Sequence, residues 1–302
     1  MNLVHFPASI SGPEGTYALF TEKPEVAVVF VHGFLGDPRK TWYNFQGLVD
    51  ELQASYHVWG RSDLFFYSYP SRGQIKPLAE QFREFLDQTF PRHGRNQQFY
   101  PPPQRPQGYA LPSGRMMTVP TKQSSPYKLL ILVGHSTGAV IIREAILQEI
   151  RPLTAEQINN ATGNNAFIIN ALLRFFAPAH RGAMCSGLIG ALLHLSVSEW
   201  LLALMLYSNP LFVSLQKGSP VLEDIKKETE ELQDKFPNIS ALKAISLFGA
   251  KDSIVYIGKY KADVDCPTEP NQTHTSICKP SKDYFRPLEF VIDGISARTA
   301  SL

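Results

Sequence analysis

Short apolar runs alternate with helix-like stretches along this chain of 302 residues. The runs are largely uninterrupted, are rich in Val, Ile, Leu and Phe, and cover residues 26–33, 63–70, 128–136, 172–180 and 242–252. Runs of this kind are typical of strands that are buried on both faces. Helical spacing follows in two of the intervals, at 77–90 and 139–150. The alternation predicts one α/β domain over residues 1–302, with a mostly parallel central sheet and helices on both faces.

Two segments interrupt this alternation. Residues 91–126 hold eight of the 23 prolines and show no apolar periodicity, so they predict a long surface excursion. Residues 187–207 are almost entirely apolar and are long enough to cross a bilayer. His194 and Glu199 lie inside that run, where a charged side chain costs about 2.5 to 3.5 kcal/mol at the bilayer centre, and no basic flank follows. The pattern therefore favours a helical lid, at about 181–235, over a membrane span.

The composition is that of a soluble globular protein, with 44% hydrophobic and 19% charged residues. The formal net charge is +2 and no Lys/Arg cluster is interleaved with aromatic residues, so we do not expect a nucleic-acid partner. Cys185, Cys266 and Cys278 are too few and too scattered to predict a disulfide framework. The first fifteen residues have neither the basic start nor the apolar core of a signal peptide, so we expect a cytoplasmic location.

Candidate chemistry begins at LVGHSTGAVI, residues 132–141, where a serine stands between two glycines at the end of an apolar run. Gly-x-Ser-x-Gly between a buried strand and a helix is the pattern of a nucleophile elbow. In such a turn the serine takes a strained backbone conformation and projects its hydroxyl above the sheet. Gly134 and Gly138 are expected there because a side chain at either position would collide with the neighbouring strand or helix. The pattern predicts Ser136 as a nucleophile, with a helix N-terminus behind it that favours negative charge.

A serine nucleophile needs a base, and the base needs an orienting acid. In a fold with this elbow the chain order is serine, acid, histidine, so the candidate bases are His180, His194 and His274. His274 is favoured, because it lies in a polar loop after the last predicted strand, where a base can reach over Ser136. His180 directly follows a strand, and we expect it to have a structural role. His194 lies in the apolar run.

Asp252 is the favoured acid, because it follows a buried strand in a Gly-x-x-Asp turn and a triad acid must be held in place to orient the imidazole. Asp263 and Asp265 stay as alternatives, in an irregular charged stretch with no strand leading into it. A tetrahedral oxyanion needs two convergent amide donors. We expect one from Thr137, directly after the nucleophile, and the other from Phe34, in the His-Gly loop after the first apolar run.

With these residues in place, the chain resembles an α/β-hydrolase. The resemblance is carried by VVFVHGFLGDPRKTW, DLFFYSYPS, VGHSTGAVIIREA, FFAPAHRGA and HTSICKP. These segments are similar to the lipase-like serine hydrolases related to GPI inositol-deacylase and to the serine-active-site-containing proteins, over most of residues 25–285. The resemblance implies a Ser/Asp/His triad, an oxyanion loop after His-Gly, and hydrolysis of an acyl or lipid-like ester without a metal or cofactor. Ala139 stands where many relatives have another glycine, and the segment 91–126 is longer than this branch leads us to expect.

The sequence thus predicts a serine hydrolase that cleaves carboxylic esters through an acyl-enzyme. Burial of an acyl chain under an apolar lid contributes about 0.8 kcal/mol per CH₂, which favours medium or long acyl groups. Acyl transfer and peptide hydrolysis use the same residues and stay open, as does a non-catalytic binding protein that retains the fold. The expected partner is a hydrophobic acyl ester. No obligate protein partner is expected, and the lid could contact a lipid surface transiently.

Overall fold

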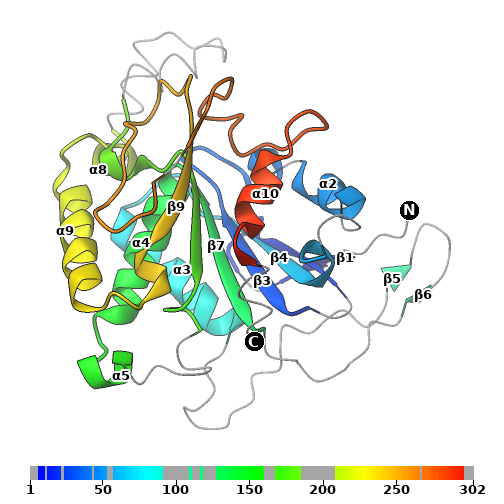
Figure 1. Cartoon of the computed structure of the whole chain (residues 1–302), viewed down its shortest axis with the longest axis horizontal. Coiled ribbons are helices and arrows are strands. Elements are labelled where there is room, and N and C mark those ends of the chain that lie inside the picture. The colour runs from blue at the N-terminus through cyan, green and yellow to red at the C-terminus, as the bar shows by residue number, and fades with distance from the viewer. Residues whose placement is uncertain are drawn as a thin grey trace.

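The described part of the chain is built around an eight-stranded sheet (Figure 1). The computed structural model describes residues 6–10, 12–21, 24–42, 44–52, 57–90, 109–110, 116–117, 127–159, 167–184, 208–265 and 267–295. The strands are β1 (Phe6–Ser9), β2 (Tyr17–Phe20), β3 (Val26–Val31), β4 (Ser62–Tyr67), β5 (Tyr109–Ala110), β6 (Met116–Met117), β7 (Leu129–His135), β8 (Leu172–Phe176), β9 (Ala244–Gly249) and β10 (Thr268–Glu269). The α-helices are α1 (Pro38–Thr41), α2 (Phe45–Leu52), α3 (Ile75–Thr89), α4 (Thr137–Ile150), α5 (Ala155–Asn159), α8 (Pro210–Ser214), α9 (Pro220–Lys235) and α10 (Arg286–Ile292), and the 3₁₀-helices are η1 (Trp59–Arg61), η3 (Ala179–Arg181) and η5 (Ser240–Leu242).

The strand order of the large sheet is β1-β2-β4-β3-β7-β8-β9-β10. From β4 to β10 the neighbouring strands are parallel, whereas β2 is antiparallel to both of its neighbours, β1 and β4. The short strands β5 and β6 pair only with each other in the described part of the chain. A parallel sheet with one antiparallel strand next to its edge, and with β4 placed before β3, is the sheet of the α/β-hydrolase fold. The predicted fold class is confirmed.

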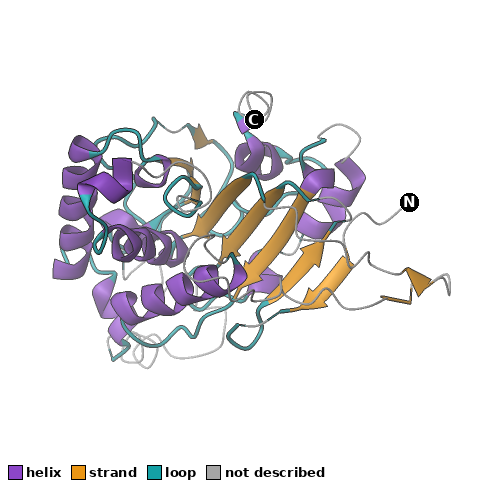
Figure 2. Cartoon of the chain, turned by 90° about the horizontal axis from the view of Figure 1, so that it is seen from below, coloured by secondary structure: helices purple, strands orange, loops and turns teal. Residues whose placement is uncertain are grey.

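Helices cover both faces of the sheet (Figures 1 and 2). On β8, the Phe175 ring lies 5.3 Å from the guanidinium of Arg143 in α4, and the Phe176 ring lies 4.9 Å from the ring of Phe290 in α10. Successive side chains of a strand point to opposite faces, so α4 and α10 lie on opposite sides of the sheet. Figure 1 shows α3 and α9 on the side of α4, and α2 on the side of α10.

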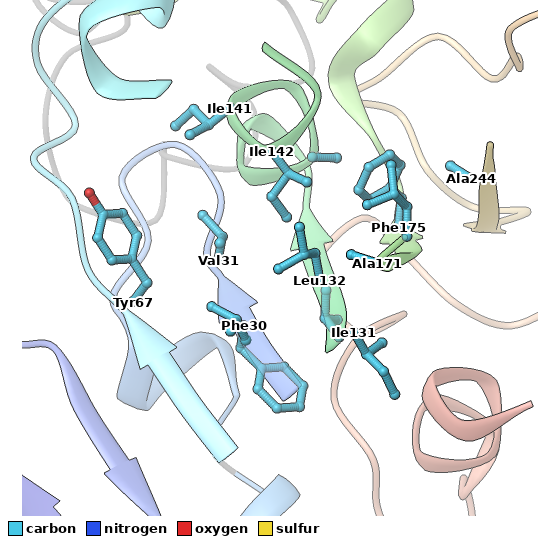
Figure 3. Close-up of a cluster of buried hydrophobic side chains, with 14 of the residues drawn as sticks. Phe30, Val31, Tyr67, Ile131, Leu132, Ile141, Ile142, Ala171, Phe175 and Ala244 are labelled. Atoms are coloured by element: carbon cyan, nitrogen blue, oxygen red, sulfur yellow. The ribbon is translucent and has the colours of Figure 1, made fainter. Parts of the chain in front are cut away.

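The central strands are buried along their whole length, which explains their uninterrupted apolar sequence. Every residue of β3, β4 and β7 is buried. In Figure 3, Val31 and Leu132 point towards Ile142 of α4, whereas Phe30 points to the other side of the sheet. There Phe30 packs against the rings of Trp42 and Phe45 at centroid distances of 5.0 Å. Because both faces are covered by apolar groups, these strands show no alternation of polar and apolar residues.

The predicted elements shift by a few residues in the structure. The helix predicted at 77–90 is α3, which begins at Ile75, and the helix predicted at 139–150 is α4, which begins directly after Ser136. The strand predicted at 172–180 ends at Phe176, because Ala177 has a positive φ of 43° and the chain then turns into η3.

The two interrupting segments lie mostly outside the described residues. Of residues 91–126, the structure describes only β5 and β6, and residues 187–207 are outside it altogether. At the end of the predicted lid region, α9 lies beside α4, and Arg151 just after α4 forms an ion pair with Glu228 of α9 at 2.6 Å. In the described part of the chain, no helix is both long and apolar enough to span a membrane. The predicted excursion and lid, like the single-domain organisation, stay predictions.

Candidate active site

Ser136 lies at a sharp turn between β7 and α4. Its backbone angles are φ 53° and ψ −118°, a conformation that costs about 1 to 3 kcal/mol for a residue with a side chain. The turn is held by its neighbours: the Ser136 amide donates to the Phe176 carbonyl at 2.9 Å, and the Ser136 carbonyl accepts from the amides of Ala139 and Ala179, each at 3.2 Å. This is the strained strand-turn-helix arrangement that the Gly-x-Ser-x-Gly pattern predicts.

The two glycines of the pattern lie where backbone approaches backbone. A Cβ atom on Gly134 would lie 2.6 Å from the Cα of Ala139, and one on Gly138 would lie 2.4 Å from the carbonyl oxygen of Val31. Backbone atoms cannot move aside as the end of a flexible side chain can. The glycines therefore allow α4 to pack directly against the strands, which keeps Ser136 at the tip of the turn.

His274 and Asp252 form a hydrogen-bonded pair. The His274 Nδ1 lies 2.9 Å from the Asp252 Oδ2, and the carboxylate is completely buried. The other carboxylate oxygen, Oδ1, accepts from the amides of Ile254 at 2.8 Å and Val255 at 3.2 Å. Burial alone would raise the pKa of Asp252, but the hydrogen bond and charge of His274 together with the two amides outweigh it and hold the pKa below its usual value. A carboxylate only accepts, so Nδ1 of His274 carries a proton, and when the ring carries only that proton Nε2 is the nitrogen that can accept one.

The loop that carries His274 lies against the serine turn. The ring of His135, the residue before Ser136, has its Nε2 2.8 Å from the carbonyl oxygen of His274, and the two imidazole centroids are 4.9 Å apart. On the other side the loop crosses the end of β9, where a Cβ atom on Gly249 would lie 2.3 Å from the Gln272 carbonyl oxygen. The structure thus brings the predicted serine, histidine and aspartate to one edge of the sheet.

His180, another candidate base, is bonded to a different part of the chain. The His180 Nε2 donates to the Gly258 carbonyl at 2.6 Å, and its ring lies 4.6 Å from that of Tyr260. Burial, followed by the nearby charge of Arg143, lowers the pKa of His180 to about 4. These contacts fit the structural role expected for His180. His194 is outside the described residues.

The alternative acids have other partners as well. Asp263 forms a buried ion pair with Arg143 of α4 and accepts from the amides of Ala244 at 2.9 Å and Tyr260 at 3.1 Å. The side chain of Asp265 is 92% exposed and pairs with Lys259. Of the three candidate carboxylates, Asp252 is the one in contact with His274.

The His-Gly loop, residues 32–36, follows β3 and is anchored by the side chain of His32. Its Nδ1 donates to the Gly33 carbonyl at 2.8 Å, its Nε2 accepts from the Tyr69 amide at 3.3 Å, and the Tyr69 ring stacks on the imidazole at 4.3 Å. Burial lowers the pKa of His32, so the ring stays neutral with this arrangement of protons. A Cβ atom on Gly33 would lie 3.0 Å from the Cβ of Ser136, so the glycine allows the loop to approach the serine closely.

One amide of the loop is bound by a side chain from another segment. Leu35 has a positive φ of 54°, and its amide donates to the hydroxyl of Ser71 at 2.8 Å. In the part of the chain that the structure describes, the amides of Phe34 and Thr137 have no hydrogen-bond acceptor. Amides without an acceptor can donate to an oxyanion, and the expectation that Phe34 and Thr137 do so beside Ser136 stays a prediction.

Four residues that support the site were not recognised from the sequence: His135, Tyr69, Ser71 and Gly249. Only Gly249 had a local signal, because it is the glycine of the Gly-x-x-Asp turn that includes Asp252. Within the described residues, no group of three or more His, Cys, Asp and Glu side chains is arranged to hold a metal ion.

Comparison with known proteins gives structural similarity without a sequence relative. No protein-family model matches the chain, and no curated protein matches it. The chain is similar to the lipase BlEst2 of Bacillus licheniformis in its propeptide form, with a TM-score of 0.47, 17% identity, and coverage of 95% of this chain and 53% of that one. The chain thus spans about half the length of that form. For the mature form of the same lipase the TM-score is 0.45, the identity is 15% and the coverages are 94% and 96%.

Two further solved structures show similarity of the same degree. Est1E from Butyrivibrio proteoclasticus has a TM-score of 0.46 and 14% identity, with 98% of each chain covered. The monoacylglycerol lipase of Paleococcus ferrophilus has a TM-score of 0.43 and 14% identity, with 99% of each chain covered. Similarities this low define neither a family nor an activity. The α/β-hydrolase fold follows from the strand order and the serine turn, and the resemblance to the GPI inositol-deacylase branch stays a prediction.

Proposed function

We propose that the protein is a serine hydrolase that cleaves carboxylic esters through an acyl-enzyme. The observation that carries this proposal is the strained backbone of Ser136 at the start of α4, in a turn whose preceding residue, His135, contacts a histidine that is hydrogen-bonded to a buried carboxylate. A solvated turn or an inert scaffold does not need strain, a base and an oriented acid at one point of the sheet.

The proposed reaction uses the described groups in order. His274 Nε2 takes the proton of the Ser136 hydroxyl while its oxygen forms a bond to the acyl carbon of the ester. The amides of Phe34 and Thr137 bind the oxyanion, and Asp252 stabilises the imidazolium through Nδ1. The C–O bond to the alcohol then breaks, and the alcohol leaves with the proton from His274. Water, deprotonated by His274, then attacks the acyl carbon, and the bond from that carbon to the Ser136 oxygen breaks. The acid leaves, and His274 returns the proton to the Ser136 oxygen. The proposed cycle needs no cofactor.

The proposed substrate is an ester with a medium or long acyl chain. Apolar side chains lie at the His-Gly loop: the Phe34 ring lies 6.2 Å from the buried ring of Phe212 in α8, and Leu35 of the loop and Val213, the residue after Phe212, are 53% and 44% exposed. We propose that the exposed side chains of Leu35 and Val213 offer apolar surface to the acyl chain. Each acyl CH₂ that they cover contributes about 0.8 kcal/mol, or roughly a fourfold gain in affinity.

The proposal is tested by labelling with a fluorophosphonate probe and by hydrolysis of p-nitrophenyl esters of increasing chain length. We expect the wild type to be labelled once per chain and to prefer butyrate or longer esters over acetate. The variant Ser136→Ala should lose both labelling and turnover. The control Ser214→Ala, which removes a hydroxyl bonded only to the Pro210 carbonyl among the described residues, should keep both. Labelling of Ser136→Ala, or its turnover at more than a residual rate, would show that another residue is the nucleophile.

The same assay distinguishes the other reactions that these residues can perform. An added alcohol acceptor yields a new ester if the acyl-enzyme prefers transfer, and a p-nitroanilide substrate is cleaved if the enzyme acts on amides. Hydrolysis of the esters alone supports the proposed reaction.

A further inference from the structure

The residue between Gly134 and Ser136 is a buried histidine with a defined proton arrangement. His135 is 7% exposed, and its Nε2 lies 2.8 Å from the carbonyl oxygen of His274. A carbonyl only accepts, so Nε2 carries the ring proton and Nδ1 does not. Nδ1 faces Gly33, where an added Cβ would lie 2.9 Å away, and it has no hydrogen-bond partner among the described residues.

This imidazole stays neutral while its neighbour changes charge. Burial, followed by the proximity of His274 and then that of Lys279, lowers the pKa of His135, which comes to about 3 with all contributions included. The hydrogen bond to the His274 carbonyl and the charge of Asp252 act in the opposite direction but are weaker. In the proposed reaction His274 becomes an imidazolium, 4.9 Å from the ring of His135. A neutral donor at that distance holds the base without the repulsion that a second positive charge would add.

The bond from His135 joins the His274 loop to the strand that carries the serine. Towards β9, the Lys251 amide donates to the Gln272 carbonyl of this loop at 3.0 Å. Further along the loop, the Pro280 carbonyl accepts from the Asn44 side chain at 2.8 Å. The bond from Lys251 holds the loop to the turn that carries Asp252. The bond from His135 links the loop to the end of β7, directly before Ser136.

We propose that His135 is a positioning residue for the reaction: its Nε2–H holds the backbone of His274 so that the imidazole stays in reach of Ser136. This inference rests on the proposed function. A shift of about 1 Å between reacting groups can reduce a rate by about 100-fold. Loss of the donor is therefore expected to lower the turnover of each competent site while leaving substrate binding almost unchanged.

The test compares substitutions that keep or remove the donor. His135→Leu fills a similar volume without a donor. His135→Gln can place its amide nitrogen near the position of Nε2, and the shorter His135→Asn cannot reach that position. The matched control is His180→Leu, because His180 is also buried and also donates from Nε2 to a carbonyl, that of Gly258, away from the base.

Competent sites are counted by titration with the fluorophosphonate probe, and kcat, KM and Tm are measured for each variant. For His135→Leu we expect kcat per titrated site to fall by about 10- to 100-fold, with KM changed by less than about threefold. His135→Gln should recover most of that loss, and His135→Asn should not. His180→Leu should lower Tm and the number of titrated sites, with kcat per site within about twofold of the wild type.

Three results would overturn the inference, and they are distinguishable from one another. If His135→Leu, or His135→Asn where the leucine variant does not fold, keeps the wild-type kcat per titrated site, the bond does not position the base. If the glutamine variant is as slow as the asparagine variant, the donor is not what matters. If the wild type itself is neither labelled nor active on esters, the proposed function fails and the inference fails with it.

Discussion

Replacement of Asp252 by asparagine removes the charge of the proposed acid and changes little else. The shape of the side chain is kept, and the new Oδ1 can still accept from the amides of Ile254 and Val255, as the carboxylate does at 2.8 and 3.2 Å. The amide NH₂ then faces His274 Nδ1, which now must accept, so the ring proton moves to Nε2. An imidazole in that tautomer cannot take the proton of Ser136.

The reverse orientation of the asparagine is disfavoured. Turning the side chain by 180° would place its oxygen towards His274 but its NH₂ against the two backbone amides. Two hydrogen bonds of about 0.5 to 1.5 kcal/mol each are then lost, and donor groups face donor groups. In the turnover step the variant also lacks the attraction between carboxylate and imidazolium. At the observed 2.9 Å and an effective dielectric near 20 this attraction has an upper limit of about 6 kcal/mol. An energy of that size corresponds to roughly 10⁴-fold in rate.

We therefore expect Asp252→Asn to lower kcat by about 10³- to 10⁴-fold on p-nitrophenyl butyrate, with the Tm and circular dichroism of a folded protein. The matched controls are Asp265→Asn, whose exposed carboxylate pairs only with Lys259 among the described residues, and Asp263→Asn, which breaks the buried ion pair with Arg143. Asp265→Asn should leave both kcat and Tm unchanged. Asp263→Asn should lower Tm while kcat per titrated site changes little. A nearly silent Asp252→Asn together with a severe loss in either control would refute the assignment of the acid.

The remaining predictions concern the base, the oxyanion loop and pH. His274→Ala should lower kcat per titrated site by about 10³-fold or more, and His180→Ala should lower it much less. The opposite ranking would make His180 the base. Ser71→Ala should lower kcat by about tenfold at nearly constant KM, because the Leu35 amide loses its acceptor and the strained loop relaxes. An unchanged kcat would show that the conformation of this loop does not affect the reaction. The folded pKa of Asp252 lies below its usual 3.8, so its contribution to stability is complete above about pH 4 and is lost as the pH falls through the folded pKa. The difference in unfolding free energy between wild type and Asp252→Asn should accordingly shrink below pH 4, and a difference that grows there would contradict the sign of the shift.

The central strands could be predicted from the sequence because they lie in the middle of the sheet, covered on both faces. Each residue of β3, β4 and β7 is buried by a helix layer on one side or the other, so the requirement for apolar side chains is continuous and visible in the sequence. The strands at or next to the edges of the sheet were missed. β1 and β2 have four residues each and β10 has two, which is too short for a periodic pattern, and their pairing depends on strands distant in the chain.

The serine turn belongs to the features that local sequence specifies. The positive φ of Ser136 and the close approach of Gly134 to Ala139 arise within a few residues of one another, so one short pattern encodes them. The close approach of Gly138 to Val31 depends on the neighbouring strand β3. The same holds for the Gly-x-x-Asp turn at Asp252, whose carboxylate accepts from the two amides that follow it.

The partners of the buried polar groups were decided by the tertiary structure alone. Asp252 and Asp263 both follow β9, and each needs a partner once it is buried, because an unpaired buried carboxylate is costly. In the folded chain Asp263 pairs with Arg143 of α4, and Asp252 pairs with His274. No local sequence pattern predicts these two pairings. In the sequence His135 is only the spacer between a glycine and the serine. Its hydrogen bond to a residue 139 positions away exists because two distant segments end at the same edge of one sheet.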